Sequence, residues 1–179
     1  MAKVVSLSKD EKHRFSKTTC DSLTLLKSLG VEGDAHCGDT VKHRSRVKVN
    51  PNQPNLRQVH LIQLEFLVEL QEKGFNVKAG SMGENVLTQE IDLLSLPRST
   101  LLRIGESTVL RVTGLRNPCV QLDNYQEGLT KACLERDEAG GLIRKAGIMA
   151  VVEQGGTINI SDAIRVEYPP EPHESLERV

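Results

Sequence analysis

The fold is decided by the stretch Leu101-Leu102-Arg103-Ile104-Gly105-Glu106-Ser107-Thr108-Val109-Leu110-Arg111-Val112. Two runs rich in β-forming residues, 101–104 and 108–112, flank a short glycine-containing loop, and this arrangement predicts a β-hairpin. The second run leads on to Arg116-Asn117-Pro118-Cys119. The hairpin therefore predicts a strand-rich domain in which one strand delivers a cysteine.

Further β-prone runs lie on both sides of this hairpin. We expect strands at 4–7, 44–49, 56–62, 148–153, 157–160 and 164–168. The segment 9–17 is charged, has no periodic apolar face and is expected to be a surface loop. Many short strands with few helices predict a mainly β (α+β) domain, closed as a small mixed β barrel or packed as a sandwich.

Few helices are expected. The clearest begins at Leu64, where Leu64, Leu67, Val68 and Leu70 share one face and Gly74 ends the element. A short helix with Leu23, Leu26 and Leu29, capped by Asp21 or Ser22 and ended by Gly30, is a second prediction. Residues 125–135 are a third candidate.

Composition limits the classes of function. With 23 Lys+Arg against 24 Asp+Glu, the 179-residue chain has no broad field that attracts nucleic acid or an anionic membrane. It also has no stretch of roughly 20 apolar residues and no apolar signal core. We expect one domain over 1–168, a disordered Pro- and Glu-rich tail over 169–179, a cytoplasmic location, and neither nucleic acid nor membrane as partner.

Cys119 is the main candidate for chemistry among the four cysteines, which are all expected to be free thiols. Pro118 fixes its own φ and restricts Asn117, so Cys119 would follow a stiff turn. Arg116 would favour the reactive thiolate if the fold brings the guanidinium near the sulfur. The alternative is an inert buried cysteine, which is the more frequent case for a cysteine considered alone. None of the cysteines forms a close pair typical of structural zinc.

Two glycine-rich segments are candidate ligand-binding loops. Gly33-Asp34-Ala35-His36-Cys37-Gly38 combines backbone freedom with a carboxylate and an imidazole, and Gly80-Ser81-Met82-Gly83-Glu84-Asn85 places a carboxylate and an amide after a tight turn. Each pattern alone is more typical of a solvated turn. The spacing of the residues alone does not decide between a ligand-binding loop and a solvated turn.

A basic region lies between these loops and contains Lys42, His43, Arg44, Arg46 and Arg57. It could receive a phosphate, although a solvated strand face is the more frequent explanation. Arg57 is the best single candidate because it opens the apolar run Gln58-Val59-His60-Leu61-Ile62. His60 within that run is expected to be a core histidine with satisfied hydrogen bonds.

Taken together and in this order, the two glycine-rich segments, Arg57-Gln58-Val59 and Arg116-Asn117-Pro118-Cys119 resemble the MOSC family, the C-terminal domain of molybdenum-cofactor sulfurases. The resemblance extends over about 4–168 and includes Ile91-Asp92-Leu93-Leu94-Ser95-Leu96-Pro97. One departure concerns the phosphate assignments. Some relatives continue the first loop with a basic Gly-Gly-Pro-Asp segment, whereas this chain reads Cys37-Gly38-Asp39-Thr40.

The resemblance implies a strand-rich barrel and a cleft for the molybdenum cofactor, a pterin dithiolene that carries a phosphate (molybdopterin). It makes Cys119 the catalytic residue, as a molybdenum ligand or as a persulfide carrier. The residues implied to bind the cofactor are Asp34, His36, Gly38, Arg57, Gly83, Glu84, Asn85, Arg116 and Asn117.

Three functions follow from the resemblance. The first is cofactor binding with reduction of N-hydroxylated compounds, which requires separate electron-transfer proteins. The second is a sulfur carrier loaded by a pyridoxal-phosphate-dependent cysteine desulfurase, with no pyridoxal phosphate bound to this chain itself. The third is a non-catalytic module for cofactor storage or delivery.

Overall fold

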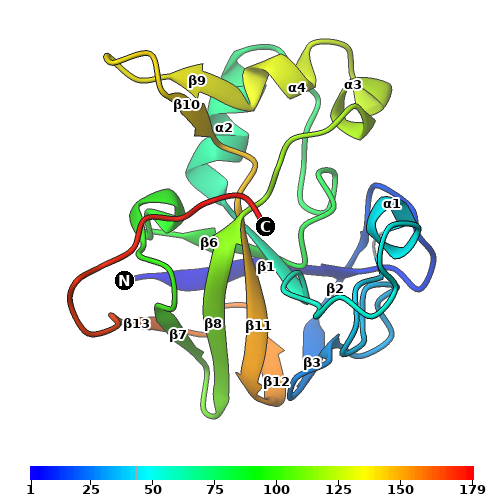
Figure 1. The fold of residues 1–179 in the computed structure, drawn as a ribbon, viewed down its shortest axis with the longest axis vertical. Helices are drawn as coiled ribbons and strands as arrows, with labels where there is room; N and C mark the ends of the chain where they lie inside the picture. The colour runs from blue at the N-terminus through cyan, green and yellow to red at the C-terminus, as the bar shows by residue number, and fades with distance from the viewer. Residues whose placement is uncertain (43) are drawn as a thin grey trace.

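The computed structural model describes residues 1–42 and 44–179, with the backbone alone for residues 44 and 45. One mixed sheet organises the chain in the order β13-β7-β8-β11-β5-β6-β1-β2 (Figure 1). Neighbouring strands in this sheet are antiparallel, except that β5 and β6 are parallel and are joined through α2. The strands are β1 Lys3–Lys9, β2 Thr18–Cys20, β5 Val59–Gln63, β6 Val86–Gln89, β7 Leu101–Ile104, β8 Thr108–Leu115, β11 Ile148–Gln154 and β13 Ile164–Glu167.

Smaller elements surround this sheet. β3 (Ser22–Leu26) pairs with β4 (Gly30–Val31) and β12 (Gly156–Asn159), while β9 (Leu134–Arg136) and β10 (Leu142–Arg144) form a hairpin that projects from the body (Figure 1). The helices are α1 Arg44–Val47, α2 Leu64–Glu72, α3 Gln121–Tyr125 and α4 Leu129–Ala132, with a short 3-10 turn, η1, at Leu93–Ser95. No helix within the described residues has the length and apolar character that a membrane span requires.

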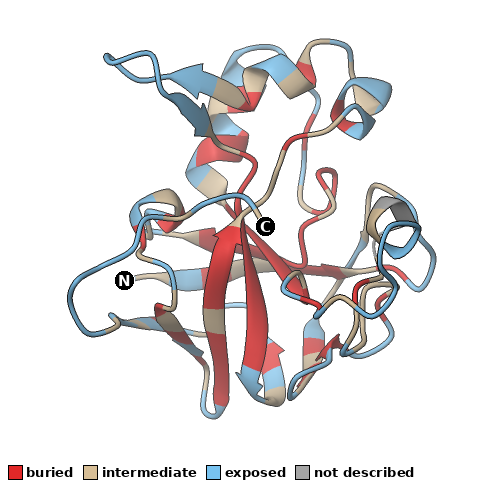
Figure 2. Cartoon of the chain, in the orientation of Figure 1, coloured by how far each residue is buried: buried red, intermediate tan, exposed pale blue. Residues whose placement is uncertain are grey.

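Two apolar clusters stabilise the fold. The first lies on the inner face of the sheet and includes Leu25, Leu61 and Leu110, all at most 1% exposed. Figure 2 shows that β8 and β11 are buried over most of their lengths. The second cluster packs α2 against the α3–α4 region through residues such as Leu70 and Leu122. The segment that carries Cys119 leaves β8 and enters α3, so it connects the two clusters.

The prediction of a mainly β domain with few helices is confirmed. The hairpin at 101–104 and 108–112 forms as β7 and β8 with Leu101 opposite Arg111, and the helix beginning at Leu64 is α2. The last three predicted strands correspond to β11, β12 and β13, and the predicted strands at 4–7 and 56–62 lie within or overlap β1 and β5.

Three local predictions were wrong. The predicted helix after Asp21 is strand β3, because Leu23 and Leu25 alternate into the core whereas Leu29 is 37% exposed. The predicted strand at 44–49 begins with helix α1, and Val49 remains 87% exposed, so this segment has no apolar face to bury in a sheet. The predicted helix at 125–135 is interrupted by Gly128 at φ 86° and ends before β9.

The predicted closure into a barrel was also wrong. Among the described residues, an isolated bridge between Lys3 and Ala163 links the N-terminal end of the chain to the region where β13 begins. Three backbone hydrogen bonds accompany it, from Val4 N to Asp162 O (2.9 Å), from Ser161 N to Val4 O (2.9 Å) and from Ile164 N to Ala2 O (2.8 Å). These contacts curl the sheet without adding a continuous ladder between its edges. The sheet is therefore not closed into a barrel.

The tail over 169–179 lies against the end of β8. Leu115 N donates to Glu177 O at 2.7 Å, and Val179 N donates to Leu115 O at 3.2 Å. Gly114 makes this approach possible, because a Cβ at that position would lie 2.3 Å from Glu177 O. The tail therefore adds a short parallel edge next to the strand that leads to Cys119.

Candidate functional site

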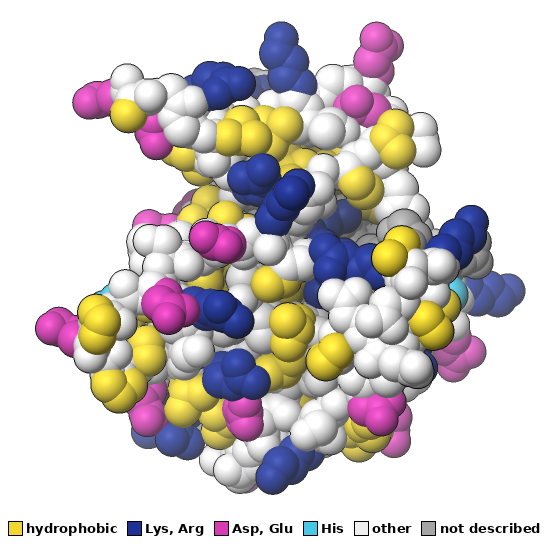
Figure 3. All heavy atoms as spheres, in the orientation of Figure 1, with side chains coloured by type: hydrophobic (Ala, Val, Ile, Leu, Met, Phe, Trp, Pro, Cys, Tyr) yellow, Lys and Arg dark blue, Asp and Glu magenta, His cyan; other side chains and the backbone are white. Residues whose placement is uncertain are grey.

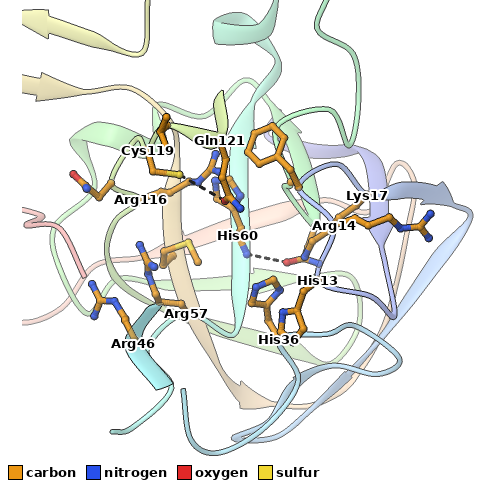
Figure 4. Close-up of a pocket in the computed structure, with 16 residues that line it drawn as sticks. His13, Arg14, Lys17, His36, Arg46, Arg57, His60, Arg116, Cys119 and Gln121 are labelled. Carbon is orange, nitrogen blue, oxygen red and sulfur yellow. Dashed lines mark hydrogen bonds between the residues drawn. The ribbon is translucent and has the colours of Figure 1, made fainter. Parts of the chain in front are cut away.

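A pocket of about 540 Å³ lies where the loop after β1, the strand β5 and the segment after β8 meet (Figure 4). Its lining combines cations, histidines and one thiol, and contains no Asp or Glu side chain among the described residues. The main polar lining residues are His13, Arg14, Lys17, His36, Arg46, Arg57, His60, Asn85, Arg116, Asn117, Cys119 and Gln121. Figure 3 shows Lys and Arg side chains gathered near the middle of one face. Such a pocket favours an anionic ligand.

Hydrogen bonds to the backbone carbonyl of Cys119 fix this residue on the pocket wall. Its carbonyl oxygen accepts from Leu122 N at 3.0 Å and from Thr130 Oγ1 at 3.1 Å, at the start of the α3–α4 region. Its Sγ atom donates to Gln121 Oε1 at 3.6 Å, and the side chain is half-buried. The preceding Pro118 is buried. The turn predicted from Pro118 therefore presents the thiol to the pocket.

Arg116 lies beside Cys119 in the pocket wall. Its Nη1 donates to Met82 O at 2.9 Å, and its guanidinium lies 5.5 Å from the centroid of the Phe15 ring. Burial lowers the pKa of the Arg116 guanidinium, and the Cys119 sulfur acts in the opposite direction. The sequence expectation that this guanidinium lies near the thiol is supported by this electrostatic interaction.

Arg57 lines the pocket with a buried hydrogen-bond donor that lacks an acceptor among the described residues. Burial, followed by the charges of Arg46 and Arg116, lowers its pKa to about 10, and Cys119 acts in the opposite direction. Its Nε is buried and has no hydrogen-bond partner among the described residues. An unpaired buried donor is costly, so this atom indicates a place for a ligand acceptor.

Asp34 anchors the first glycine-rich loop from behind the pocket. Its Oδ2 accepts from Lys17 Nζ at 2.7 Å and from Asn85 Nδ2 at 3.1 Å, while its Oδ1 accepts from His36 N at 2.9 Å. Burial alone raises the pKa of this carboxyl, but the hydrogen bonds from His36 and the Lys17 charge outweigh burial and hold the pKa well below its usual range. Burial lowers the pKa of Lys17 despite the Asp34 carboxylate.

The second glycine-rich loop is folded around Glu84. This carboxylate accepts from the backbone N–H groups of Gly80 and Met82, is 1% exposed, and has its pKa raised by burial. Gly83 adopts φ 83°, and a Cβ there would lie 2.6 Å from Phe15 O. Asn85 then faces the pocket. Glu84 therefore shapes the loop, whereas Gly83 and Asn85 line the pocket.

A family model described as the MOSC domain matches residues 31–165, which is well over half of the chain. The chain belongs to the MOSC family. The resemblance drawn from the four ordered segments is thereby confirmed. No curated protein matches the chain.

Solved structures share the fold. The YuaD protein from Bacillus subtilis matches with a TM-score of 0.75 and 23% identity, covering 94% of this chain and 97% of that one. YiiM from Geobacillus stearothermophilus matches with a TM-score of 0.68 and 18% identity, covering 98% and 80%. YiiM from Escherichia coli matches with a TM-score of 0.64 and 19% identity, covering 97% and 73%. At these identities, the likeness shows the MOSC fold alone.

The MOSC pocket gathers most of the residues expected from sequence. Those that line it are His36, Arg57, Gly83, Asn85, Arg116, Asn117 and Cys119. Asp34 and Glu84 support the lining from behind, and Gly38 lies outside it, where Asn55 Nδ2 donates to its carbonyl at 2.9 Å. His43 lies outside the described residues.

Several lining residues of the MOSC domain were missed by sequence reasoning. The segment 9–17, taken as a surface loop, contributes His13, Arg14, Phe15 and Lys17 to the pocket. Its lack of periodicity hid this role, and only its density of basic side chains gave a signal. His60 is a buried histidine whose Nε2 lies 2.8 Å from Ala146 O, as expected, but it also lines the pocket.

The other cysteines of the MOSC domain lie outside this pocket. All four cysteines are free thiols. Burial raises the pKa of Cys37, with Asp34 and Glu32 adding to the effect, and burial raises the pKa of Cys133 to about 12. The described residues contain no group of three or more His, Cys, Asp or Glu side chains that could hold a metal ion.

Proposed function

We propose that this MOSC domain binds the molybdenum cofactor in the basic pocket, uses Cys119 as a ligand of the metal, and reduces N-hydroxylated compounds. The observation that carries the proposal is the Cys119 thiol on the wall of a pocket whose charged lining is entirely cationic among the described residues. A thiolate is a soft ligand that suits a metal already held by dithiolene sulfur. MOSC domains are often linked to this cofactor.

The residues present fit such a group. The cofactor carries a phosphate, and Arg57 offers a buried Nε without a partner beside Arg46 and Arg116. Guanidinium groups suit phosphate because their N–H donors match its oxygens. The absence of a lining carboxylate among the described residues removes the main source of repulsion. A single protein thiolate is sufficient when the pterin supplies the remaining sulfur ligands.

Each lining group then has a role toward the bound cofactor. Arg57 and Arg46 would hold the phosphate, and His36 and Asn117 would bond the polar edge of the pterin. Asn85, whose amide already bonds Ser8, Asp34 and His60, would hold the loop that lines the site. Asp34, Glu84, Gly83 and Gly38 would fix the loops that carry those groups. When bound, the cofactor would supply a redox-active metal that takes an oxygen atom from the substrate. Electrons would come from separate electron-transfer proteins.

Element and pterin analysis tests the proposal. Wild-type protein and the Cys119→Ala variant would be purified from a molybdenum-replete host, with Cys20→Ala as a matched control outside the pocket. We expect molybdenum in the wild type and in the control, and its loss from Cys119→Ala. Full retention of molybdenum by Cys119→Ala would exclude direct ligation, and absence of both metal and pterin from all three would exclude cofactor binding.

A second candidate function is sulfur transfer, favoured by the partial exposure of Cys119 next to Val120, which is 68% exposed. The Cys119 thiolate would attack the outer sulfur of a cysteine desulfurase persulfide, and the desulfurase thiolate would leave. This candidate predicts a mass increase of one sulfur atom on Cys119 after incubation with desulfurase and cysteine. Equal labelling of Cys20, or no labelling, would reject it.

A third candidate, cofactor storage or delivery, shares the binding step. It differs by showing bound pterin without turnover of any N-hydroxylated compound in the presence of an electron donor.

A further inference from the structure

A second pocket lies directly beside the first and shares Arg46, Arg57 and Asn117 with it. Its volume is also about 540 Å³. The rest of its lining includes Gln53, Pro54, Leu56, Arg178 and Val179. A small ligand that entered the first pocket could therefore extend past Arg57 into the second without leaving the protein surface.

The second pocket is cationic and its cations lack acidic partners. Arg46, Arg57 and Arg178 line it, and its described lining contains no Asp or Glu side chain. Some arginines elsewhere pair with carboxylates, as Arg103 does with Glu167 at 2.8 Å and Arg111 with Glu153 at 2.5 Å. None of the three pocket arginines forms an ion pair with a described residue. Arg178 lines only the second pocket, so its charge stays available to a further anionic group when Arg46 and Arg57 hold the cofactor phosphate.

The amide of Asn117 adds a directed polar group between the pockets. Its Oδ1 accepts from Arg144 Nε at 3.2 Å. With the oxygen held in this way, the amide NH₂ has no acceptor among the described residues. Asn117 can therefore donate to a ligand oxygen at the boundary of the pockets.

The tail forms one wall of the second pocket. Glu177 O and Val179 N are both hydrogen-bonded to Leu115, so the backbone on each side of Arg178 is held. The Arg178 side chain itself is exposed and takes no part in these bonds. A change of this side chain therefore alters the charge of the pocket without removing the bonds that hold the tail.

We propose that the second pocket binds a carboxylate or similar anionic group of the substrate, while the N-hydroxy end of the same molecule reaches the cofactor pocket beside Cys119. The inference rests on the proposed function and adds a substrate class, anionic N-hydroxylated compounds. The alternative occupant is a nucleotide extension of the cofactor. The described lining of the second pocket contains no aromatic side chain on which a base would stack, so a small anionic group fits better.

Steady-state kinetics of the molybdenum-loaded protein test this substrate class. The probes are benzamidoxime, which is neutral, and 4-carboxybenzamidoxime, with a chemically reduced dye as electron donor. We expect the wild type to prefer the carboxylated probe by about tenfold in kcat/KM, through KM, which corresponds to one charge-assisted hydrogen bond. Arg178→Ala should abolish the preference. Arg165→Ala removes another exposed, unpaired arginine that lies outside both pockets and should keep it. No preference in the wild type, or an unchanged preference in Arg178→Ala, overturns the inference.

Equilibrium binding separates this inference from the proposed function. Calorimetry with full-length, molybdenum-free protein measures the affinity for 4-carboxybenzamidoxime, and Arg178→Ala should weaken it about tenfold whereas Arg165→Ala should not. Arg178-dependent binding in a protein that never acquires molybdenum rejects the proposed function but keeps the anion site. Arg178-independent binding in a protein that does acquire molybdenum rejects the inference alone. Release of a nucleoside monophosphate from the loaded protein on acid hydrolysis would assign the pocket to the cofactor and also overturn the inference.

Discussion

Replacing Asp34 by Asn would test the network that holds both glycine-rich loops. The Lys17 and Asp34 side chains are 5% and 1% exposed, and their charged atoms lie 2.7 Å apart. Asn at this position would leave the Lys17 charge buried without a counter-ion and would point an amide NH₂ at other donors. Breaking one side of a buried pair costs about 3–5 kcal/mol, a large part of the roughly 5–15 kcal/mol that stabilises a domain.

The expected loss of unfolding free energy differs between replacement of Asp34 and replacement of Lys17. In Lys17→Met, Asp34 keeps hydrogen bonds from the His36 backbone and from Asn85, so we expect a smaller loss of about 2 kcal/mol. The double variant Lys17→Met/Asp34→Asn has no buried charge at this site and should be more stable than the sum of the single losses predicts, by about 2 kcal/mol or more. Urea unfolding of the metal-free protein at pH 7 measures all three. If the loss of stability in the double variant equals the sum of the two single losses within about 0.5 kcal/mol, the reasoning is refuted.

The same network has a defined pH dependence. Because the folded pKa of Asp34 lies well below its usual range, its contribution is fully present above the unfolded pKa of about 4. The contribution is lost as the pH falls below that value and approaches the folded pKa. The gap in unfolding free energy between wild type and Asp34→Asn should therefore stay constant from pH 7 to 5 and shrink below pH 4. A gap that widens in acid would contradict the assignment.

Three further substitutions probe the frame around the site. Gly83→Ala places a side chain at φ 83° and 2.6 Å from Phe15 O, so thermal unfolding should shift down by several degrees, about 2–4 °C for each kcal/mol lost. Arg57→Met removes the buried unpaired Nε, so the metal-free protein should become about 1 kcal/mol more stable while calorimetry shows weaker binding of inorganic phosphate; weaker folding with unchanged phosphate binding would oppose this. Gly114→Ala would push against Glu177 O and should speed hydrogen exchange at the Val179 amide, whereas unchanged exchange would show that the tail does not depend on this contact.

The sequence predicted the parts of the fold whose residues repeat at a regular spacing. The hairpin of β7 and β8 and the helix α2 could be identified because neighbouring side chains share one environment. The stretch around Leu23 could not, because its leucines fit both a helical and an alternating pattern, and pairing with β12, more than 130 residues away, decides for the strand. Lys17 was missed for a related reason: its burial is created by Asp34 and by Gly80, whose carbonyl accepts from Lys17 N at 2.8 Å.

The MOSC motif segments divide their charges between two environments, and this division gives the pocket its cationic lining. The carboxylates of Asp34 and Glu84 point into the protein and are satisfied by backbone N–H groups, by Asn85 and by Lys17. Arg57 and Arg116, from the other two motif segments, line the pocket, where Arg57 retains an unpaired donor. A sequence that is nearly neutral as a whole, with 23 basic and 24 acidic residues, therefore presents a cationic interior surface. The cationic character of the pocket follows from the direction of these side chains, which composition alone does not reveal.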